Sequence, residues 1–430
     1  MMGILKNLQA KLSLFSIKEK WFLFASMCCS YLISLDYALV RPVSNSLFLQ
    51  AYGASALPYA WMLSIPMNFL IVVFYNKFIH KMGCLKMFLL IASVIALGNT
   101  ASSIWIGKGS LFPFIFYIWK DIYIMLMFQL LWSVIHSNVQ IAKAKYLYGV
   151  LFGIGAIGGL SGSLLASKYA IQLGSESLLL GTLPIYLLLA WSYHKLIQYS
   201  SSLELGQDSD METGSSVKES LLLIGRSKLL KGIVLMVILM QVTSTITDFQ
   251  FNTYLEQLYP SKDLRTAYFS KLLGWGNILT MSFQFIGVYV LIRYLGKLKT
   301  HLMVPLVLGC NCLAFLCYPV FGVISYSFLT IKCFDFSLFN VIKEMLYIPL
   351  KPQEKFKAKA LIDVFMYRGA KMFASFFVML VQLCVANSAV PLLSWITCIL
   401  CFFWVFIILS IKQSYSEAQD SSLRPVSSDS

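Results

Sequence analysis

The segment Ile342–Lys371 reads IKEMLYIPLKPQEKFKAKALIDVFMYRGAK and places a dense group of charged residues between two long apolar stretches. Lys351, Lys355, Lys357 and Lys359 lie at its centre. An ionised side chain inside a lipid bilayer is costly unless it is paired or hydrated. We therefore expect this segment to lie at the cytoplasmic membrane surface, with its two ends reaching into membrane-spanning helices.

The composition of the whole chain indicates a membrane protein. Of its 430 residues, 58% are hydrophobic and 12% are charged, whereas charged residues make up roughly 25% of a typical soluble protein. Its continuous apolar runs reach the roughly 20 residues that a helix needs to cross a bilayer. They lack the alternation of a membrane β-barrel. The predicted fold class is an all-α polytopic membrane protein.

Twelve transmembrane helices are predicted from the apolar runs. Basic residues gather in alternate loops, which places both termini in the cytoplasm by the positive-inside rule. The predicted spans are Trp21–Val40, Tyr59–Tyr75, Leu85–Trp105, Leu111–Ile135, Tyr146–Ile171, Leu178–Leu196, Lys231–Phe251, Tyr268–Ile292, His301–Gly322, Ile324–Leu346, Ala360–Ala386 and Pro391–Ile411.

A polar linker divides the chain into two six-helix halves. Its central part, Ser201–Ser220, is rich in serine, glycine and acidic residues and is too hydrophilic to pack. Two such halves are typical of major-facilitator-like transporters. The predicted organisation is a cytoplasmic amphipathic N-terminus (1–20), an N-terminal six-helix bundle (21–198), a cytoplasmic linker (199–230), a C-terminal six-helix bundle (231–411) and a disordered cytoplasmic tail (412–430).

The net charge of +15 does not indicate nucleic-acid binding, because the basic residues lie in short loops between spans, as membrane orientation requires. The lipid bilayer is therefore the expected partner. The sequence leaves the oligomeric state open.

Polar residues inside the predicted spans are the candidate functional residues. Charges at membrane depth need partners or a hydrated cavity, and their mixed signs predict a polar cavity between the halves. Lys332 and Asp335 also have the i, i+3 spacing of a pair that could satisfy itself. The first and seventh spans each carry an acid followed by an aromatic residue, at Asp36 and Asp248.

No motif predicts catalysis, a metal site or a cofactor. The glycines Gly153, Gly155 and Gly158 form a GxGxxG pattern, but they open an apolar helix rather than follow a strand. Small residues spaced four apart, such as Gly158 and Gly162, instead favour close helix packing. The chain has no HExxH pattern and no Walker lysine loop, so we expect no enzyme activity.

Several stretches resemble the ATP/ADP translocase family, the nucleotide transporters of obligate intracellular bacteria and plastids. The resemblance is most specific in the charged segment, and it extends in patches from the first span to the eleventh. The matching stretches are Lys343–Leu350 (KEMLYIPL), Lys355–Asp363 (KFKAKALID), Tyr367–Lys371 (YRGAK), Asp248–Pro260 (DFQFNTYLEQLYP), Ala267–Thr280 (AYFSKLLGWGNILT), Ala144–Gly162 and Arg41–Gly53 with Pro58.

The resemblance implies a secondary antiporter that binds ATP and exchanges it for ADP across the bacterial inner membrane. The family's seventh-span acid falls on Asp248, and its nearby lysine falls on Asn252. In the first span only Arg41 keeps the family's pattern, since its lysine falls on Ser44. The expected substrate-binding residues are Arg41, Asp248, Lys271, Arg368 and Lys371, and the possible cavity or coupling residues are Asp36, Asn252, Lys332 and Asp335.

Two other functions remain open. A multiply charged anion needs cationic partners in a site of low dielectric constant, and two of the family's cations are absent here. The same fold could therefore carry another small anionic metabolite, or a nucleoside with protons. A non-transporting membrane scaffold or lipid-modifying enzyme is the remaining alternative.

Overall fold

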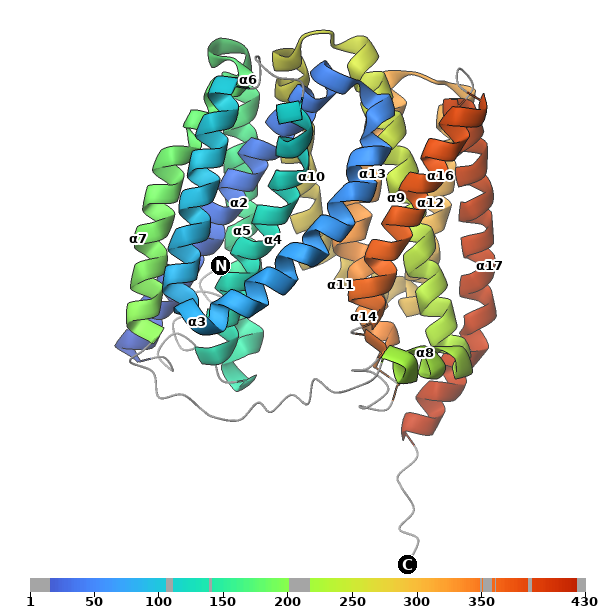
Figure 1. The fold of residues 1–430 in the computed structure, drawn as a ribbon. Helices are drawn as coiled ribbons and strands as arrows, with labels where there is room; N and C mark the ends of the chain where they lie inside the picture. Colours follow the sequence, from blue (N-terminus) through green and yellow to red (C-terminus); the bar gives the residue numbers. More distant parts are fainter. Residues whose placement is uncertain are drawn as a thin grey trace, which may run out of the picture. The chain divides into compact units, whose positions relative to one another are not determined.

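The computed structural model describes residues 16–105, 111–138, 141–200, 217–348, 350, 358–359, 361–385 and 389–423. Within these residues, twelve helices are long and apolar enough to cross a membrane. They confirm the predicted all-α polytopic fold with twelve spans (Figure 1). The central lysines Lys351, Lys355 and Lys357 of the charged segment lie outside the described residues, as do most of the predicted linker and the residues before Ser16.

The chain forms two compact units. The first comprises Met1–Tyr52, Pro66–Ser209 and Tyr259–Asn277, and the second comprises Gly53–Ile65, Asp210–Leu258 and Ile278–Ser430. The start of the second span, Gly53–Ile65, thus belongs to the second unit although it lies in the N-terminal half of the sequence. The start of the eighth span, Tyr259–Asn277, belongs to the first unit although it lies in the C-terminal half.

The first unit is built around α2, which packs against α4, α5 and α7. Its core includes Phe88 and Tyr193, whose rings stack with centroids 3.6 Å apart. The helices of this unit are α2 (Ile17–Tyr52), α3 (Leu57–Trp105) from Pro66 onward, α4 (Leu111–Asn138), α5 (Ile141–Leu173), α6 (Ser175–Leu180), α7 (Thr182–Ser200) and the part of α10 (Lys262–Ser282) up to Asn277.

Helix α2 is longer than predicted. The predicted span ends at Val40, but the helix continues through Pro42 to Tyr52. Membrane helices tolerate an internal proline when neighbouring helices and side chains satisfy the freed carbonyl group. As a result, Arg41 and Ser44 are helical residues, and Ser44 is buried.

Glycines allow α5 to lie directly against α2. A Cβ atom added at Gly158 would come 2.2 Å from the backbone oxygen of Tyr31, and one added at Gly162 would come 2.3 Å from that of Leu35. The Ser30 hydroxyl also donates to the Leu151 carbonyl oxygen across this contact, at 3.0 Å. The glycine pattern therefore serves helix packing, as its four-residue spacing predicted.

A glycine also makes the sharp connection between the second and third spans. The assigned helix α3 contains one non-helical residue, Gly83, with φ of 74° and ψ of 162°. Residues with a side chain rarely adopt this backbone conformation, whereas glycine adopts it readily. Gly83 therefore separates two predicted spans that are otherwise continuous in α3.

The second unit has its core around Trp404, which is fully buried among residues of α9, α12, α14 and α17. Figure 1 shows the short helix α8 lying crosswise to α9 within this unit. Its elements are η1 (Ala54–Ala56), the part of α3 before Pro66, α8 (Val217–Arg226), α9 (Lys228–Leu258), the end of α10, η2 (Phe283–Gly287), α11 (Val288–Leu295), α12 (Lys297–Cys317), α13 (Phe321–Phe334), η3 (Asp335–Phe339), α14 (Asn340–Leu346), η4 (Ile362–Met366), α16 (Tyr367–Val385) and α17 (Ala389–Leu423).

Some boundaries in the second unit differ from the predicted ones. The ninth span, predicted to reach Gly322, ends at Cys317, two residues before Pro319, because a proline cannot donate the next helical hydrogen bond. Helix α8 lies within the predicted linker, and α17 continues to Leu423 in the predicted tail. The tenth and eleventh spans include the π-helical turns η3 and η4.

Ion pairs hold the described part of the charged segment. Lys343 Nζ lies 2.7 Å from Asp363 Oδ1, and Lys359 Nζ lies 2.6 Å from Glu344 Oε2. Both pairs join the end of the tenth span to residues that precede α16. Between them, burial raises the pKa of Tyr347 well above its usual value, and the charges of Asp363 and Glu344 raise it further. Tyr347 is therefore a neutral core residue.

Candidate functional site

A lysine and an aspartate from two long helices meet in the second unit. Lys332 on α13 places its Nζ atom 2.7 Å from Asp248 Oδ2 and 3.0 Å from Ser244 Oγ, both on α9. Ser244 and Asp248 are four residues apart and share one face of the helix. The side chains of Lys332 and Asp248 are 16% and 18% exposed, so the pair is only partly buried.

Asp335 lies close to this pair but has different partners. Its Oδ2 atom accepts hydrogen bonds from Gln241 Nε2 at 3.4 Å and from the Tyr367 hydroxyl at 3.2 Å. The i, i+3 spacing suggested that Lys332 and Asp335 pair with each other. Instead, Lys332 pairs with Asp248. The packing of α13 against α9 brings Lys332 to Asp248, while Gln241 and Tyr367 bind Asp335.

The other predicted residues of the second unit lie on the same helices. Asn252 is 4% exposed, and its Nδ2 atom donates to the Asp248 carbonyl oxygen at 2.7 Å. Arg368 and Lys371 are half-buried on the first turns of α16. Tyr367, the first residue of α16, contacts Asp335, so it positions the start of that helix beside the cluster.

The first unit holds Arg41 and Lys271. The Arg41 guanidinium carbon lies 5.9 Å from the ring centre of Tyr37 and 6.0 Å from that of Phe269, within the range of a cation–π contact. Phe269 is on α10, and the exposed Lys271 follows two residues later. Arg41 therefore lies where α2 approaches α10 within this unit.

Asp36 is almost completely buried, at 1% exposure. Its Oδ2 atom accepts hydrogen bonds from the hydroxyls of Tyr123 at 3.0 Å and Tyr186 at 2.8 Å. Tyr123 is on α4 and Tyr186 is on α7, so this carboxyl group joins three helices of the first unit.

The family's other first-span position is also buried. Ser44, where the family has a lysine, is 0% exposed, and the neighbouring Asn45 is 4% exposed. Both side chains are therefore shielded from solvent. An ammonium group at position 44 would therefore be held inside the protein.

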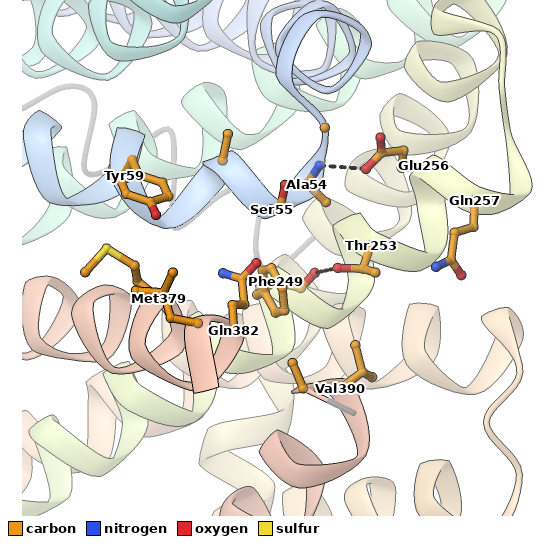
Figure 2. Close-up of a pocket in the computed structure, with 14 residues that line it drawn as sticks. Ala54, Ser55, Tyr59, Phe249, Thr253, Glu256, Gln257, Met379, Gln382 and Val390 are labelled. Atoms are coloured by element: carbon orange, nitrogen blue, oxygen red, sulfur yellow. Dashed lines mark hydrogen bonds between the residues drawn. The ribbon is translucent and has the colours of Figure 1, made fainter. Parts of the chain in front are cut away.

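The second unit contains a pocket of about 650 Å³, a volume typical of small-molecule sites. Figure 2 shows Tyr59, Gln382 and Thr253 around it, and the hydrogen bond from the Ala54 backbone nitrogen to Glu256 Oε2, which measures 2.6 Å. Among the described residues that line it, Glu256 is the only charged one. None of the predicted substrate-binding residues is among those lining residues.

Sequence reasoning missed the hydrogen-bond partners of the buried acids. Tyr186 is 150 residues from Asp36 in the sequence, and Tyr367 is an ordinary aromatic residue before a basic one. A single sequence carries no signal for such long-range contacts. Ser244 could have been found, because it lies one helical turn before Asp248.

Comparisons with known proteins find similarity to ATP/ADP transporters. The TLC ATP/ADP transporter family matches residues 320–415. ADP,ATP carrier protein 4 of Rickettsia conorii is 21% identical over 478 residues, covering 92% of each chain. ADP,ATP carrier protein 3 of Rickettsia bellii is 25% identical over 355 residues, covering 70% of this chain and 69% of that one.

Solved structures share the fold. A bacterial homologue of the iron transporter ferroportin, in an inward-facing state, superposes with a TM-score of 0.64 at 12% identity, covering 92% of this chain and 99% of that one. The nucleoside transporter NupG superposes with a TM-score of 0.57 at 12% identity, covering 94% and 99%. The chain, with its twelve candidate spans, thus shares the fold of these transporters, and the resemblance to the ATP/ADP translocase family is confirmed at low sequence identity.

Proposed function

We propose that this divergent relative of the ATP/ADP translocases is a secondary transporter that exchanges ATP for ADP across the bacterial inner membrane. Transport as the general activity is supported by the family match and by the fold. Nucleotide exchange is the more specific part of the proposal. Alternating access is the mode that two six-helix halves support.

The position of the family match within the chain carries this proposal. Residues 320–415 contain Lys332, Asp335, Arg368 and Lys371. This region therefore combines the family match with three of the predicted site cations, Lys332, Arg368 and Lys371. A nucleotide carrying several negative charges requires cations in a site of low dielectric constant. In the first unit, Arg41 and Lys271 are the predicted substrate-binding cations.

Lys332 is the cation that we propose to bind the substrate. It is partly exposed and bonded to Asp248. An anionic substrate would compete with the Asp248 carboxylate for the Lys332 ammonium group. Asp248 would then hold Lys332 in place while the transporter carries no substrate.

Uptake of labelled ATP and ADP by Escherichia coli cells expressing the chain tests the proposal. We expect both nucleotides to enter, and each to compete with the other. Loss of uptake in Lys332→Gln, with normal amounts of protein in the membrane, would support the role of this lysine. If well-expressed wild-type protein takes up neither nucleotide, nucleotide transport is excluded.

A nucleoside is the second candidate cargo, and the pocket of Figure 2 favours it. Its described lining combines aromatic rings with neutral polar groups, and its one acid, Glu256, already accepts a backbone hydrogen bond. Such a lining suits an uncharged polar ring system better than a polyanion. Uptake of labelled adenosine that unlabelled adenosine blocks but excess ATP does not would favour this cargo.

A further inference from the structure

A small second cavity lies inside the second unit, separate from the pocket of Figure 2. It measures about 20 Å³, and roughly 10–15 Å³ is enough for one water molecule. Four helices contribute to its lining, namely α9, α12, α13 and α17. The lining residues that bear polar side chains are Thr243, Thr247, Gln250, Asn311, Ser327 and Thr397.

Two of these side chains have donors that no described protein group accepts. Thr243 is 1% exposed, and its Oγ1 atom has no hydrogen-bond partner. The same is true of the Nδ2 atom of Asn311, which is also buried. A buried donor without a partner destabilises the fold by about 1–3 kcal/mol, so native proteins usually satisfy such groups, often with ordered water.

The remaining hydroxyl groups can act only as acceptors toward the cavity. Thr247 donates its proton to the Thr243 carbonyl oxygen, Ser327 donates to that of Val323 and Thr397 donates to that of Leu393, each at 2.9 Å. Their oxygen lone pairs remain available. The cavity therefore combines two donors with several acceptors, and water is a ligand that accepts two hydrogen bonds and donates two.

We propose that this cavity is the binding site of one ordered water molecule that joins α9, α12, α13 and α17. Thr243 and Asn311 donate to the water, and the water donates to two of the oxygens of Thr247, Ser327 and Thr397. No charged side chain is among the described residues of the lining, which favours a neutral occupant over a metal cation.

The water site shares α9 and α13 with the pair of Lys332 and Asp248. On α9, Thr243 and Thr247 immediately precede Ser244 and Asp248, and on α13, the lining residue Ile331 immediately precedes Lys332. The water fixes α9 against α13 and thereby positions the pair. This role does not depend on which cargo the protein carries.

The isosteric substitution Thr243→Val tests the water site, because the expected change in Tm differs between a hydrated and a dry cavity. Thr245→Val serves as its control. If water is bound, Thr243→Val removes one of its donors and lowers the Tm of the purified full-length protein by about 2–4 °C. If the cavity is dry, the same substitution removes an unsatisfied hydroxyl and leaves the Tm unchanged or raises it. The latter result would overturn the proposal.

Thr245→Val is the matched control. Thr245 is equally buried on α9, but its hydroxyl donates to the Gln241 carbonyl oxygen at 2.8 Å and it is not among the lining residues. We expect a smaller loss of Tm here than for Thr243→Val. An equal loss of Tm in the two variants would show that replacing any buried threonine of α9 has this effect, and would argue against a bound water.

Two further measurements identify the occupant. A high-resolution experimental structure should show one density peak within hydrogen-bond distance of Thr243 Oγ1 and Asn311 Nδ2. The Tm should also be the same in sodium chloride and in choline chloride at equal ionic strength. If sodium raised the Tm and Thr243→Val abolished that rise, the occupant would be a cation. This result would contradict the proposal.

Discussion

Lys332 has two acidic neighbours, and the choice between them depends on helix geometry. The sequence places Asp335 one turn away, yet Lys332 bonds Asp248, 84 residues away. Asp335 has its own partners, Gln241 and Tyr367. Intramembrane charges could be found from the sequence, but their pairing could not, because it depends on the packing of distant helices.

Breaking this ion pair should harm the fold as well as transport. Lys332→Gln leaves the Asp248 carboxylate without its cation, and Asp248→Asn leaves the Lys332 ammonium group without its anion. Because the pair is partly exposed, we expect each single change to cost about 1–3 kcal/mol, between the values for exposed and fully buried pairs. Thermal unfolding in detergent measures this cost.

The double variant Asp248→Asn/Lys332→Gln separates stability from function. It contains no unpaired charge, so its Tm should recover toward the wild-type value while transport stays lost. A double variant as unstable as the sum of the two single variants would show that the two residues do not form a pair.

Ser44 provides a prediction about the missing family cation. Ser44→Lys would place an ammonium group at a position with 0% exposure, at a cost of about 2.5–3.5 kcal/mol near the centre of a membrane helix. We expect poor expression and a lower Tm. Ala51→Lys, at an exposed position near the end of the same helix, should be tolerated. If Ser44→Lys is equally stable, position 44 must reach water.

The contact between α2 and α5 depends on glycine at two positions. Gly158→Ala and Gly162→Ala would each drive a methyl group into a backbone oxygen of α2, and overpacking of this kind costs about 1–3 kcal/mol. Gly149→Ala, on the same helix with no atom within 4 Å of its added Cβ, should be neutral. Thermal unfolding of the three variants checks this, and equal effects would argue against a close helix contact.

The existence and order of the helices could be predicted better than their ends. Lengths of apolar runs and alternating basic loops gave all twelve spans. The end of α2 was missed because Pro42 normally interrupts a helix in water, whereas packed neighbours allow it to continue in a membrane protein. The end of the ninth span was missed because Cys317 and Gly322 are separated only by a short apolar stretch.

For the whole molecule, the basic loops predict that both termini lie in the cytoplasm. A fluorescent protein fused to the C-terminus should fluoresce, while alkaline phosphatase at the same place should be inactive. Alkaline phosphatase fused after Pro260, in the short segment between α9 and α10, should be active. The reverse pattern of reporter activities would show that both termini lie outside the cytoplasm, contrary to the prediction.

Exchange by purified protein in liposomes tests the central claim most directly. Vesicles loaded with ADP are placed in labelled ATP, and the initial rate of uptake is compared with that of empty vesicles. Our account predicts uptake that requires internal nucleotide and is lost in Lys332→Gln. It should be retained in Lys299→Gln, which changes an exposed lysine at the start of α12. Folded wild-type protein that shows no ATP uptake with internal ADP would contradict nucleotide exchange.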